Sequence, residues 1–331
     1  MALRATGGHI MSRATAIAHP NIALIKYWGK RDLALNLPAV SSVSLTLSGF
    51  ATKTSVETGA ASDVVLVNGE IASERFGARV LTFLDRILVG RGPLTIETES
   101  NFPMGAGLAS SASGFAALTL AACAATGRPT DPVILSTLSR LGSGSACRSF
   151  WDGFVHWRRG EQADGTDSHG HPIDALDGWD LAMVIGVVET GPKAVGSTEG
   201  MERSRNTSAF YQQWIDSSER DVSDALLAIE QRDLDALGEA MERSTFKMHA
   251  TMHSATPPLI YWKAHTLDVL QAVFHLRASG VSAWATMDAG PQVKILCHAT
   301  DANDVVAAIQ PYTQETHILR PGPGAHLIGE P

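Results

Sequence analysis

The sequence predicts an α+β protein folded as two lobes, and three observations lead to this fold class. The chain has 331 residues, and because domains average roughly 100–200 residues it is long enough for two. Segments with the two-residue periodicity of strands and segments with the spacing of amphipathic helices are both present. They follow one another without the regular strand–helix–strand order of a parallel sheet. We expect a boundary between the lobes near residues 180–190.

Strands dominate the start of the chain. Four segments alternate between apolar and polar side chains: 12–24, 42–47, 53–57 and 64–67. The dipeptide Asn68-Gly69 follows the last segment, and it favours the tight turn of a hairpin. The stretch 26–38 is polar and rich in turn residues. We therefore predict antiparallel strands connected by hairpins in this part of the chain.

Helices come next. The segment 73–89 places its apolar side chains on one helical face: Phe76, Val80, Phe83, Leu84 and Ile87. A short strand is predicted at 94–97, and an alanine-rich helix then ends at Gly127. Another helix is predicted at 131–140, where Pro132 suits the first helical position.

The second half of the chain begins with a buried strand at 179–188, where the residues are almost all apolar. Three long amphipathic segments are predicted as helices: 207–232, 234–250 and 258–280. The remaining predicted elements are strands at 282–287, 293–297 and 316–319 and a helix near 301–310. For the domains we expect an extension or tag remnant at 1–11, an N-terminal lobe at 12–188 and a C-terminal lobe at 189–331.

The composition of the chain excludes several classes of protein. Hydrophobic residues make up 44% of the chain and charged residues 18%, values of a globular rather than a disordered protein. The net charge of −8 argues against nucleic-acid and membrane partners, although it allows a local basic pocket for a phosphorylated ligand. Three widely spaced cysteines exclude a disulfide scaffold, and no apolar run reaches the roughly 18 residues of a membrane span. We expect a cytoplasmic protein whose partner is a small molecule.

The segment 103–114, PMGAGLASSASG, has the composition of a phosphate-binding loop. Gly105 and Gly107 allow close approach of the backbone to a ligand. Ser110 and Ser111 open the alanine-rich helix, whose free N–H groups attract anions. A Walker A loop would need Gly-Lys-Ser/Thr, and a dinucleotide fingerprint would need a third glycine where Ser110 stands. An ordinary glycine-rich turn before a helix is the plain alternative.

Three more segments combine residue types that bind or act on anions. Residues 21–30, NIALIKYWGK, place two lysines and two aromatic residues around a glycine. Residues 142–148, GSGSACR, end in Arg148, whose guanidinium suits a carboxylate or phosphate. Asp288 follows an apolar strand and precedes Ala-Gly-Pro, a rigid position for a general base or metal ligand. The plain alternatives are a solvated basic turn, a small-residue loop and a turn-forming aspartate.

Histidines give a weak signal for metal binding. His249 and His253 have the i, i+4 spacing of a metal pair, but the residues between them lack the glutamate of zinc proteases. No third ligand is evident. His169 and His171 lie in a glycine-rich segment and are interpreted as solvated.

Taken together, the segments NIALIKYWGK, NFPMGAGLASSASG, GSGSACRS and MDAGP resemble the mevalonate diphosphate decarboxylase family of the GHMP kinase superfamily. The resemblance runs from about Ala14 to the last strand, and ADGTDS, GSTEGM and MHATMHSATPP extend it. It implies the two-lobed GHMP kinase fold, with an S5-domain-2-like N-terminal lobe and a ferredoxin-like C-terminal lobe. The implied reaction is ATP-dependent decarboxylation of mevalonate 5-diphosphate to isopentenyl diphosphate, ADP, phosphate and carbon dioxide, after phosphorylation of the C3 hydroxyl.

The resemblance also implies roles for individual residues. Asp288 is the implied base or orienting carboxylate for the C3 hydroxyl, and Lys26 is implied to stabilise charge beside it. Arg148, with Ser145 and Asn21, is implied to hold the C1 carboxylate. The implied ATP phosphate loop comprises Gly105, Gly107, Leu108, Ala109, Ser110 and Ser111. The implied contacts of the 5-phosphate end are Tyr27, Lys30, Ser143, Ser197 and Arg79. Mg²⁺ is expected to bind through phosphates without a defined protein ligand, and a homodimer is expected.

The chain departs from the family's pattern at a few positions. Some bacterial members carry arginine directly after the position of Ser197, where this chain has Thr198, and the usual TFDAGPN is here TMDAGPQ, with Met287 and Gln292. Fewer cations at the 5-phosphate end would suit one phosphate, so mevalonate 5-phosphate, giving isopentenyl phosphate, is an alternative substrate. Two further alternatives are a mevalonate-type kinase without decarboxylation and a non-enzymatic ligand sensor. The catalytic positions named above are all present, which favours the decarboxylase.

Overall fold

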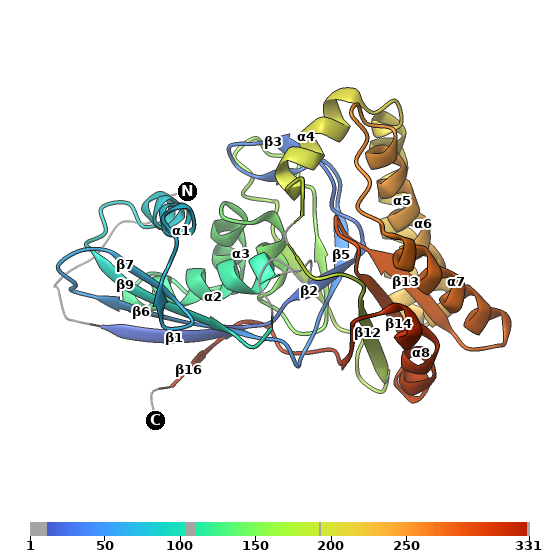
Figure 1. Cartoon of the computed structure of the whole chain (residues 1–331). Coiled ribbons are helices and arrows are strands. Elements are labelled where there is room, and N and C mark those ends of the chain that lie inside the picture. The colour runs from blue at the N-terminus through green and yellow to red at the C-terminus, as the bar shows by residue number, and fades with distance from the viewer. Residues whose placement is uncertain (1–11, 103–109, 192, 330–331) are drawn as a thin grey trace.

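The chain folds into two lobes of mixed helices and strands, so the predicted α+β class is confirmed. The computed structural model describes residues 12–102, 110–191 and 193–329. Figure 1 shows one lobe, coloured mostly blue and green, beside a second lobe that runs from yellow to red. Within the described residues, no helix has both the length and the apolar content needed to cross a membrane.

A six-stranded sheet in the order β16-β1-β6-β9-β7-β8 forms the outer part of the N-terminal lobe. Its strands are β1 (Arg13–Ala18), β6 (Thr52–Thr58), β7 (Val64–Val67), β8 (Glu70–Ile71), β9 (Leu94–Ser100) and β16 (His326–Ile328). Helices α1 (Glu74–Ile87), α2 (Ser110–Ala125) and α3 (Pro132–Arg140) complete this lobe. The predicted apolar face of α1 packs on the sheet, where Val80 and Phe83 share a core with Ile96 and Phe115. Asp131 caps α3 by accepting a hydrogen bond from the Val133 N–H at 2.9 Å.

A second sheet, in the order β11-β10-β5-β2, connects the lobes. Its strands are β2 (Asn21–Ile25), β5 (Ser42–Thr46), β10 (Phe154–Trp157) and β11 (Gly170–Ile173). The single strand predicted at 12–24 was wrong, because the chain breaks at Pro20, which has no N–H to continue a ladder. Ile22 and Leu45 pack against Met183 and Leu237 of the C-terminal lobe. The end of β2 therefore lies where the two lobes meet.

The polar stretch predicted as turns at 26–38 contains a small ribbon of β3 (Lys30–Asp32) and β4 (Leu37–Pro38). The short 3₁₀ helix η1 (Gly144–Arg148) follows α3. Both segments contain residues that the sequence singles out: Lys30 lies in β3, and Ser145 and Arg148 lie in η1.

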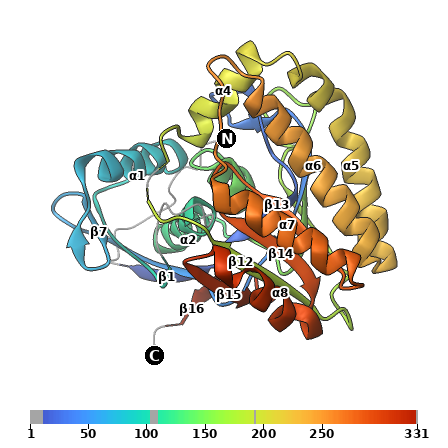
Figure 2. The same cartoon turned by 45° about the vertical axis from the view of Figure 1, so that its right-hand side comes forward.

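The C-terminal lobe is a four-stranded sheet with helices on both faces. The sheet has the order β13-β14-β12-β15, with β12 (Leu181–Val187), β13 (Ala283–Met287), β14 (Val293–His298) and β15 (Glu315–Leu319). Alternate residues of β12 face opposite cores, which explains why the whole strand is buried: Met183 and Ile185 share one core with α5 and α6, while Ala182 and Val184 share another with α7 and α8. The helices are α5 (Tyr211–Gln231), α6 (Leu234–His253), α7 (Ala264–Ala278) and α8 (Ala302–Ile309). Figure 2 shows α5 and α6 side by side.

Two helices differ from the sequence expectation. The segment predicted as a helix at 258–280 becomes helical only at Ala264, and residues 258–263 form a loop in which Leu259 and Tyr261 are buried. Helix α4 (Ser197–Thr207) was not predicted, because it is mostly polar and buries little more than Gly200, Met201 and Ser204. An element that packs over so small an area leaves no apolar periodicity in the sequence.

The chain passes between the lobes more than once. Strand β12 pairs with β14 and β15 of the C-terminal lobe, and β16, near the end of the chain, pairs with β1 of the N-terminal lobe. The division at residue 188 stays a prediction. Between strand β12 and α4 the structure describes residues 188–191 and 193–196, here together called the connector.

Candidate active site

A cavity of about 840 Å³ between the lobes gathers most of the site residues expected from the sequence. The expected residues that line it are Asn21, Lys26, Tyr27, Lys30, Arg79, Ser111, Ser143, Ser145, Arg148, Ser197 and Asp288. Ser110 lines a smaller cavity beside it. The expected loop residues Gly105, Gly107, Leu108 and Ala109 lie outside the described part of the chain.

Asp288 lies between two lysines at the inner end of the cavity. Strand β13 ends at Met287 and holds the carboxylate at its tip. The Nζ of Lys26, which follows β2, donates to Oδ1 at 2.7 Å. The Nζ of Lys294, in β14, donates to Oδ2 at 3.0 Å. Both lysine side chains are 1% exposed, whereas Asp288 is one-third exposed.

These contacts set the charge states of the group. Although burial acts to raise it, the pKa of Asp288 is held well below its usual range by Lys26 and Lys294. Burial lowers the pKa of Lys26 to about 8, against the opposing attraction of Asp288. The carboxylate is thus ionised, and the Lys26 ammonium can lose its proton within the ordinary pH range of an enzyme assay.

Arg148 is buried in the wall of the cavity, where the small residues of η1 leave room for it. Its Nε donates to Asn21 Oδ1 at 3.0 Å, and its Nη1 donates to Ser42 Oγ at 3.0 Å. Asn21 is in turn held by the Ser145 carbonyl at 3.0 Å. This arrangement fixes the plane of the guanidinium and leaves its outer fork, Nη1 and Nη2, for a carboxylate in the cavity.

Another part of the cavity wall presents hydroxyls and cations. The Ser143 hydroxyl lies 3.2 Å from the hydroxyls of Ser111 and Ser145, and the Nζ of Lys30 lies 3.5 Å from Thr198 Oγ1. The buried hydroxyl of Tyr27 has no hydrogen-bond partner among the described residues. A donor held in this way fits a ligand oxygen.

Two helices begin at the wall of the cavity. Ser111 belongs to the first turn of α2, and Ser197 and Thr198 belong to the first turn of α4. The free N–H groups of a helix start carry partial positive charge, so both helix starts favour an anionic ligand.

The structure adds three cations that sequence reasoning missed: Arg75, Lys193 and Lys294. Arg75 precedes Arg79 by one turn of α1 and lines the cavity with it. Lys193, in the connector, also lines the cavity, and its Nζ donates to Ser197 Oγ at 3.3 Å. Lys294 had a sequence signal, because it stands within the apolar strand VKILC, where a charge needs a partner. Lys193 and Arg75 had none beyond their charge.

A smaller cavity of about 430 Å³ adjoins the first, and the two share Arg79, Ser111 and Lys193. Its walls come from the six-stranded sheet, α1 and α2. Apolar side chains dominate them: Val65, Phe76, Val80, Ile96, Phe115 and Leu118. Threonine and serine hydroxyls from β6 and β9 supply half of the polar side chains. Such a pocket suits a flat, uncharged ring attached to an anionic chain.

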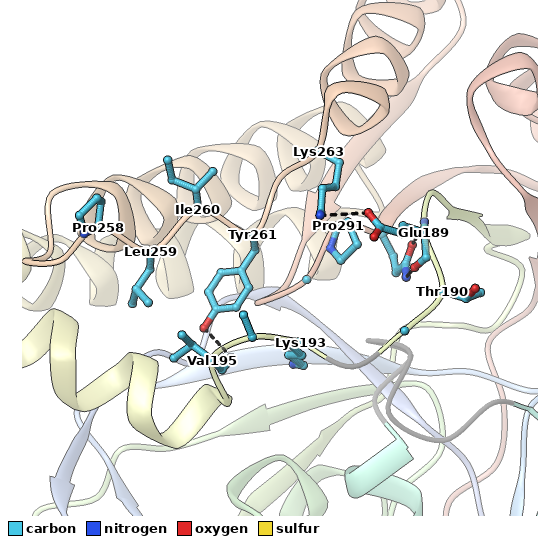
Figure 3. A pocket seen from close by; sticks show the side chains of 14 residues that line it. Glu189, Thr190, Lys193, Val195, Pro258, Leu259, Ile260, Tyr261, Lys263 and Pro291 are labelled. Atoms are coloured by element: carbon cyan, nitrogen blue, oxygen red, sulfur yellow. Dashed lines mark hydrogen bonds and ion pairs between the residues drawn. The ribbon is translucent and has the colours of Figure 1, made fainter.

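A third cavity, of about 340 Å³, lies between the connector, the loop at 258–263 and the turn after Asp288 (Figure 3). The Tyr261 hydroxyl donates to the Val195 carbonyl at 3.2 Å, and Lys263 pairs with Glu189 at 3.2 Å, so both ends of the connector are tied to this loop. Gln292 is buried here rather than in the large cavity. Its Oε1 accepts from the Val188 N–H at 2.7 Å and its Nε2 donates to the Glu189 carbonyl at 2.6 Å. Gln292 therefore holds the connector and does not line the large cavity.

The histidine pair of α6 packs with aromatic rings. The His249 ring lies 4.7 Å from that of Trp262 and 5.9 Å from that of His253, measured between centroids. Burial lowers the pKa of His249 to about 3, so the ring is neutral. Within the described residues, no group of three or more His, Cys, Asp or Glu is placed to hold a metal ion.

The charge of the large cavity decides what it can bind. Six cationic side chains line it among the described residues: Lys26, Lys30, Arg75, Arg79, Arg148 and Lys193. Three carboxylates line it: Glu199, Glu202 and Asp288. The excess of positive charge, in a chain whose net charge is −8, fits a small ligand with several negative groups. The arrangement can clamp a carboxylate at Arg148, hold phosphate at the helix starts and act on a hydroxyl at Asp288.

Comparison with known proteins extends the picture. The family profile described as the diphosphomevalonate decarboxylase-like N-terminal domain matches residues 18–170. The profile described as the mevalonate 5-diphosphate decarboxylase C-terminal domain matches residues 183–321. A diphosphomevalonate decarboxylase of Aspergillus fumigatus is 36% identical, over 93% of this chain and 82% of its own length.

Solved structures are similar over nearly the whole chain. Mevalonate diphosphate decarboxylase from Staphylococcus aureus has a TM-score of 0.91 and 36% identity, covering 97% of this chain and 99% of its own. A complex described as MDDEF with MVAPP, AMPPCP and magnesium has a TM-score of 0.90 and 38% identity, covering 97% of this chain and 100% of its own.

Proposed function

Since the chain belongs to the diphosphomevalonate decarboxylase family, we propose that it catalyses the ATP-dependent decarboxylation of mevalonate 5-diphosphate. The products are isopentenyl diphosphate, ADP, phosphate and carbon dioxide. The observation that carries the proposal is the placement of Asp288, Lys26 and Arg148 in one cationic cavity beside an apolar pocket. The complex of a similar protein with MVAPP, the ATP analogue AMPPCP and magnesium supports it.

The chemistry requires two stages. A tertiary hydroxyl is a poor leaving group, so the C3 oxygen first forms a bond to the γ-phosphorus of ATP while the bond from that phosphorus to ADP breaks. The C3–O bond then breaks, releasing phosphate and leaving cationic character at C3. The bond between C1 and C2 breaks next, its electrons form the double bond between C2 and C3, and C1 leaves as carbon dioxide.

The residues divide these tasks. Asp288 receives or orients the proton of the C3 hydroxyl, and Lys26 stabilises negative charge on the phosphoryl group that approaches it. Arg148 binds the C1 carboxylate through its fork. Ser145 and Asn21 keep that fork in place. The fixed geometry is the main contribution of these side chains, because phosphoryl transfer depends on positioning and charge.

ATP is proposed to span the two cavities. Its base would occupy the apolar pocket, and its phosphates would reach the shared edge at Ser111, Arg79 and Lys193. Since the described residues offer no carboxylate or imidazole cluster for a metal ion, Mg²⁺ is proposed to bind through the ATP phosphates near the Ser110 and Ser111 hydroxyls. When bound there, it supplies neutralisation of phosphate charge.

The diphosphate is favoured over the monophosphate by the number of cations. Thr198 does stand where some bacterial members have arginine, but Lys30, Arg75 and Arg79 all line the cavity. A terminal phosphate adds charge that these three residues can neutralise. A homodimer and a cytoplasmic location are further proposals, which size-exclusion chromatography and cell fractionation would test.

The deciding experiment measures release of ADP and carbon dioxide with mevalonate, its 5-phosphate and its 5-diphosphate side by side. We expect equal amounts of both products and a strong preference for the diphosphate. Preference for the monophosphate would make isopentenyl phosphate the product and overturn the substrate. ADP without carbon dioxide would identify a kinase, and no turnover with any of them would favour a ligand sensor.

A further inference from the structure

Lys294 is a buried lysine that the proposed reaction does not use. It is the second residue of β14, its side chain is 1% exposed, and it does not line the large cavity. Strands β12 and β13 flank it, with Ile185 and Thr286 directly opposite in the two ladders. Thr286 is itself tied to Thr245 of α6 at 2.9 Å. The sheet therefore holds the lysine from both sides.

Lys26 meets the same carboxylate under different constraints. It follows the end of β2, so a strand fixes it on one side only, and its side chain lines the cavity. Its Nζ contacts Asp288 Oδ1, while the Nζ of Lys294 contacts Oδ2. One ammonium thus faces the reacting groups and the other lies behind the carboxylate.

This difference matters for the reaction. Both oxygens of Asp288 are occupied, yet the C3 hydroxyl needs one of them. Lys26 can move with the transferring phosphoryl group, because both lie in the cavity, whereas Lys294 stays within the sheet. With no partner left, the carboxylate would be free to rotate and would bind a proton more readily. A second, fixed ammonium prevents both.

We propose that Lys294 is a positioning residue for phosphoryl transfer, and that it holds Asp288 in place and ionised while Lys26 leaves Oδ1 to the C3 hydroxyl. The inference rests on the proposed function. Lys294 touches neither substrate nor ATP in this assignment and acts through Asp288.

The other charged or titratable groups around Asp288 remain in any variant of Lys294. Lys26 faces it from the end of β2, Arg148 from η1 and Lys193 from the connector, and the neutral ring of His249 faces it from α6. The pKa values of Asp288 and Lys26 decide in which direction the pH profile moves. Removing Lys294 takes a positive charge from Asp288, so the pKa of Asp288 rises. It also takes a like charge from Lys26, so the pKa of Lys26 rises from its value of about 8.

The test uses Lys294→Met, whose side chain is unbranched, only one atom shorter than lysine, uncharged and suited to an apolar strand. We expect kcat to fall about 100-fold, with the KM for mevalonate 5-diphosphate changed less than about threefold. In the pH profile of kcat/KM, the alkaline limb set by Lys26 moves to higher pH, and any acidic limb set by Asp288 moves the same way. A merely structural lesion lowers the rate at every pH and leaves the limbs in place.

Two further variants keep the test decisive. Lys294→Gln retains an N–H donor without the charge. We expect a smaller loss of kcat, about tenfold, with the same displacement of the two limbs of the pH profile. This variant also tests the inference if the methionine variant does not fold. Arg128→Met removes another buried cation as a control. Arg128 follows the end of α2, and its described hydrogen bond goes to the Val89 carbonyl. We expect this variant to leave kcat and the pH profile unchanged. Wild-type limbs or near-wild-type kcat in the Lys294 variants would overturn the inference. Loss of the proposed function itself would show differently, as absence of carbon dioxide release by the wild-type enzyme.

Discussion

The two adjoining cavities of this protein differ in the charge and polarity of the side chains that line them. The larger one is lined by an excess of cations and assembles Lys26, Arg148 and Asp288 from three distant segments of the chain. The smaller one is mostly apolar, with hydroxyls, and its walls come from one sheet and the two helices packed on it. Charge thus surrounds the proposed multiply charged ligand, and apolar surface surrounds the proposed uncharged ring of ATP. The comparison teaches that changes of charge should alter handling of the mevalonate ligand, and changes of shape should alter handling of ATP.

The largest effect is expected from Asp288→Asn. An amide cannot accept the proton of the C3 hydroxyl, so we expect kcat to fall about 10³-fold or more. ATP affinity should change little, because the base and most phosphate contacts lie elsewhere. Assays of ADP release together with nucleotide titration check this, and the exposed Asp216→Asn serves as the control. Normal turnover in the Asp288 variant would show that Asp288 neither accepts nor orients the proton of the C3 hydroxyl.

Arg148→Lys should come next, with kcat/KM lowered about 100-fold for the mevalonate ligand. A single ammonium cannot reproduce the fork, nor the bonds to Asn21 and Ser42 that orient it. The measurement is steady-state kinetics with each substrate varied in turn, beside the exposed Arg158→Lys. Retention of most activity would exclude a carboxylate clamp at this position.

Phe76→Ala tests the other cavity. Phe76 is half-buried in its wall, and loss of the ring should raise the KM for ATP about tenfold through lost apolar and stacking contact. The KM for mevalonate 5-diphosphate should stay within about twofold, since the ring does not line the larger cavity. Phe210→Ala, an exposed phenylalanine at the start of α5, is the control. Equal effects on both substrates would contradict the division between the cavities.

The smallest effect is expected from Arg75→Met. Arg75 is exposed, so water and salt screen its charge, and the KM for the diphosphate should rise about threefold at low ionic strength and less at high salt. The monophosphate, with less charge at this end, should be affected less. The exposed Arg220→Met controls for net charge. If the diphosphate and monophosphate respond alike, Arg75 has no part in choosing between them.

The sequence by itself predicted what depends on neighbouring residues. The apolar face of α1 and the buried strand β12 were visible because backbone geometry repeats over a few residues and leaves a pattern in the sequence, and Pro132 indicated the start of α3. The family resemblance also indicated which residues would meet in the site. The break at Pro20 had a signal in the proline, whereas α4 lacked a signal because it buries so few side chains.

Tertiary structure decided what depends on packing between distant segments. Lys26 and Asp288 are 262 residues apart in the chain and 2.7 Å apart in space, a distance set by how the sheet carrying β2 docks on the C-terminal lobe. The side of β14 on which Lys294 lies, the meeting of Arg75 with the cavity and the attachment of Gln292 to the connector were likewise settled there. The type of a residue determines which interactions it can make. Its actual partner depends on burial, because burial excludes water and a buried charge then pairs with the group that the fold places beside it.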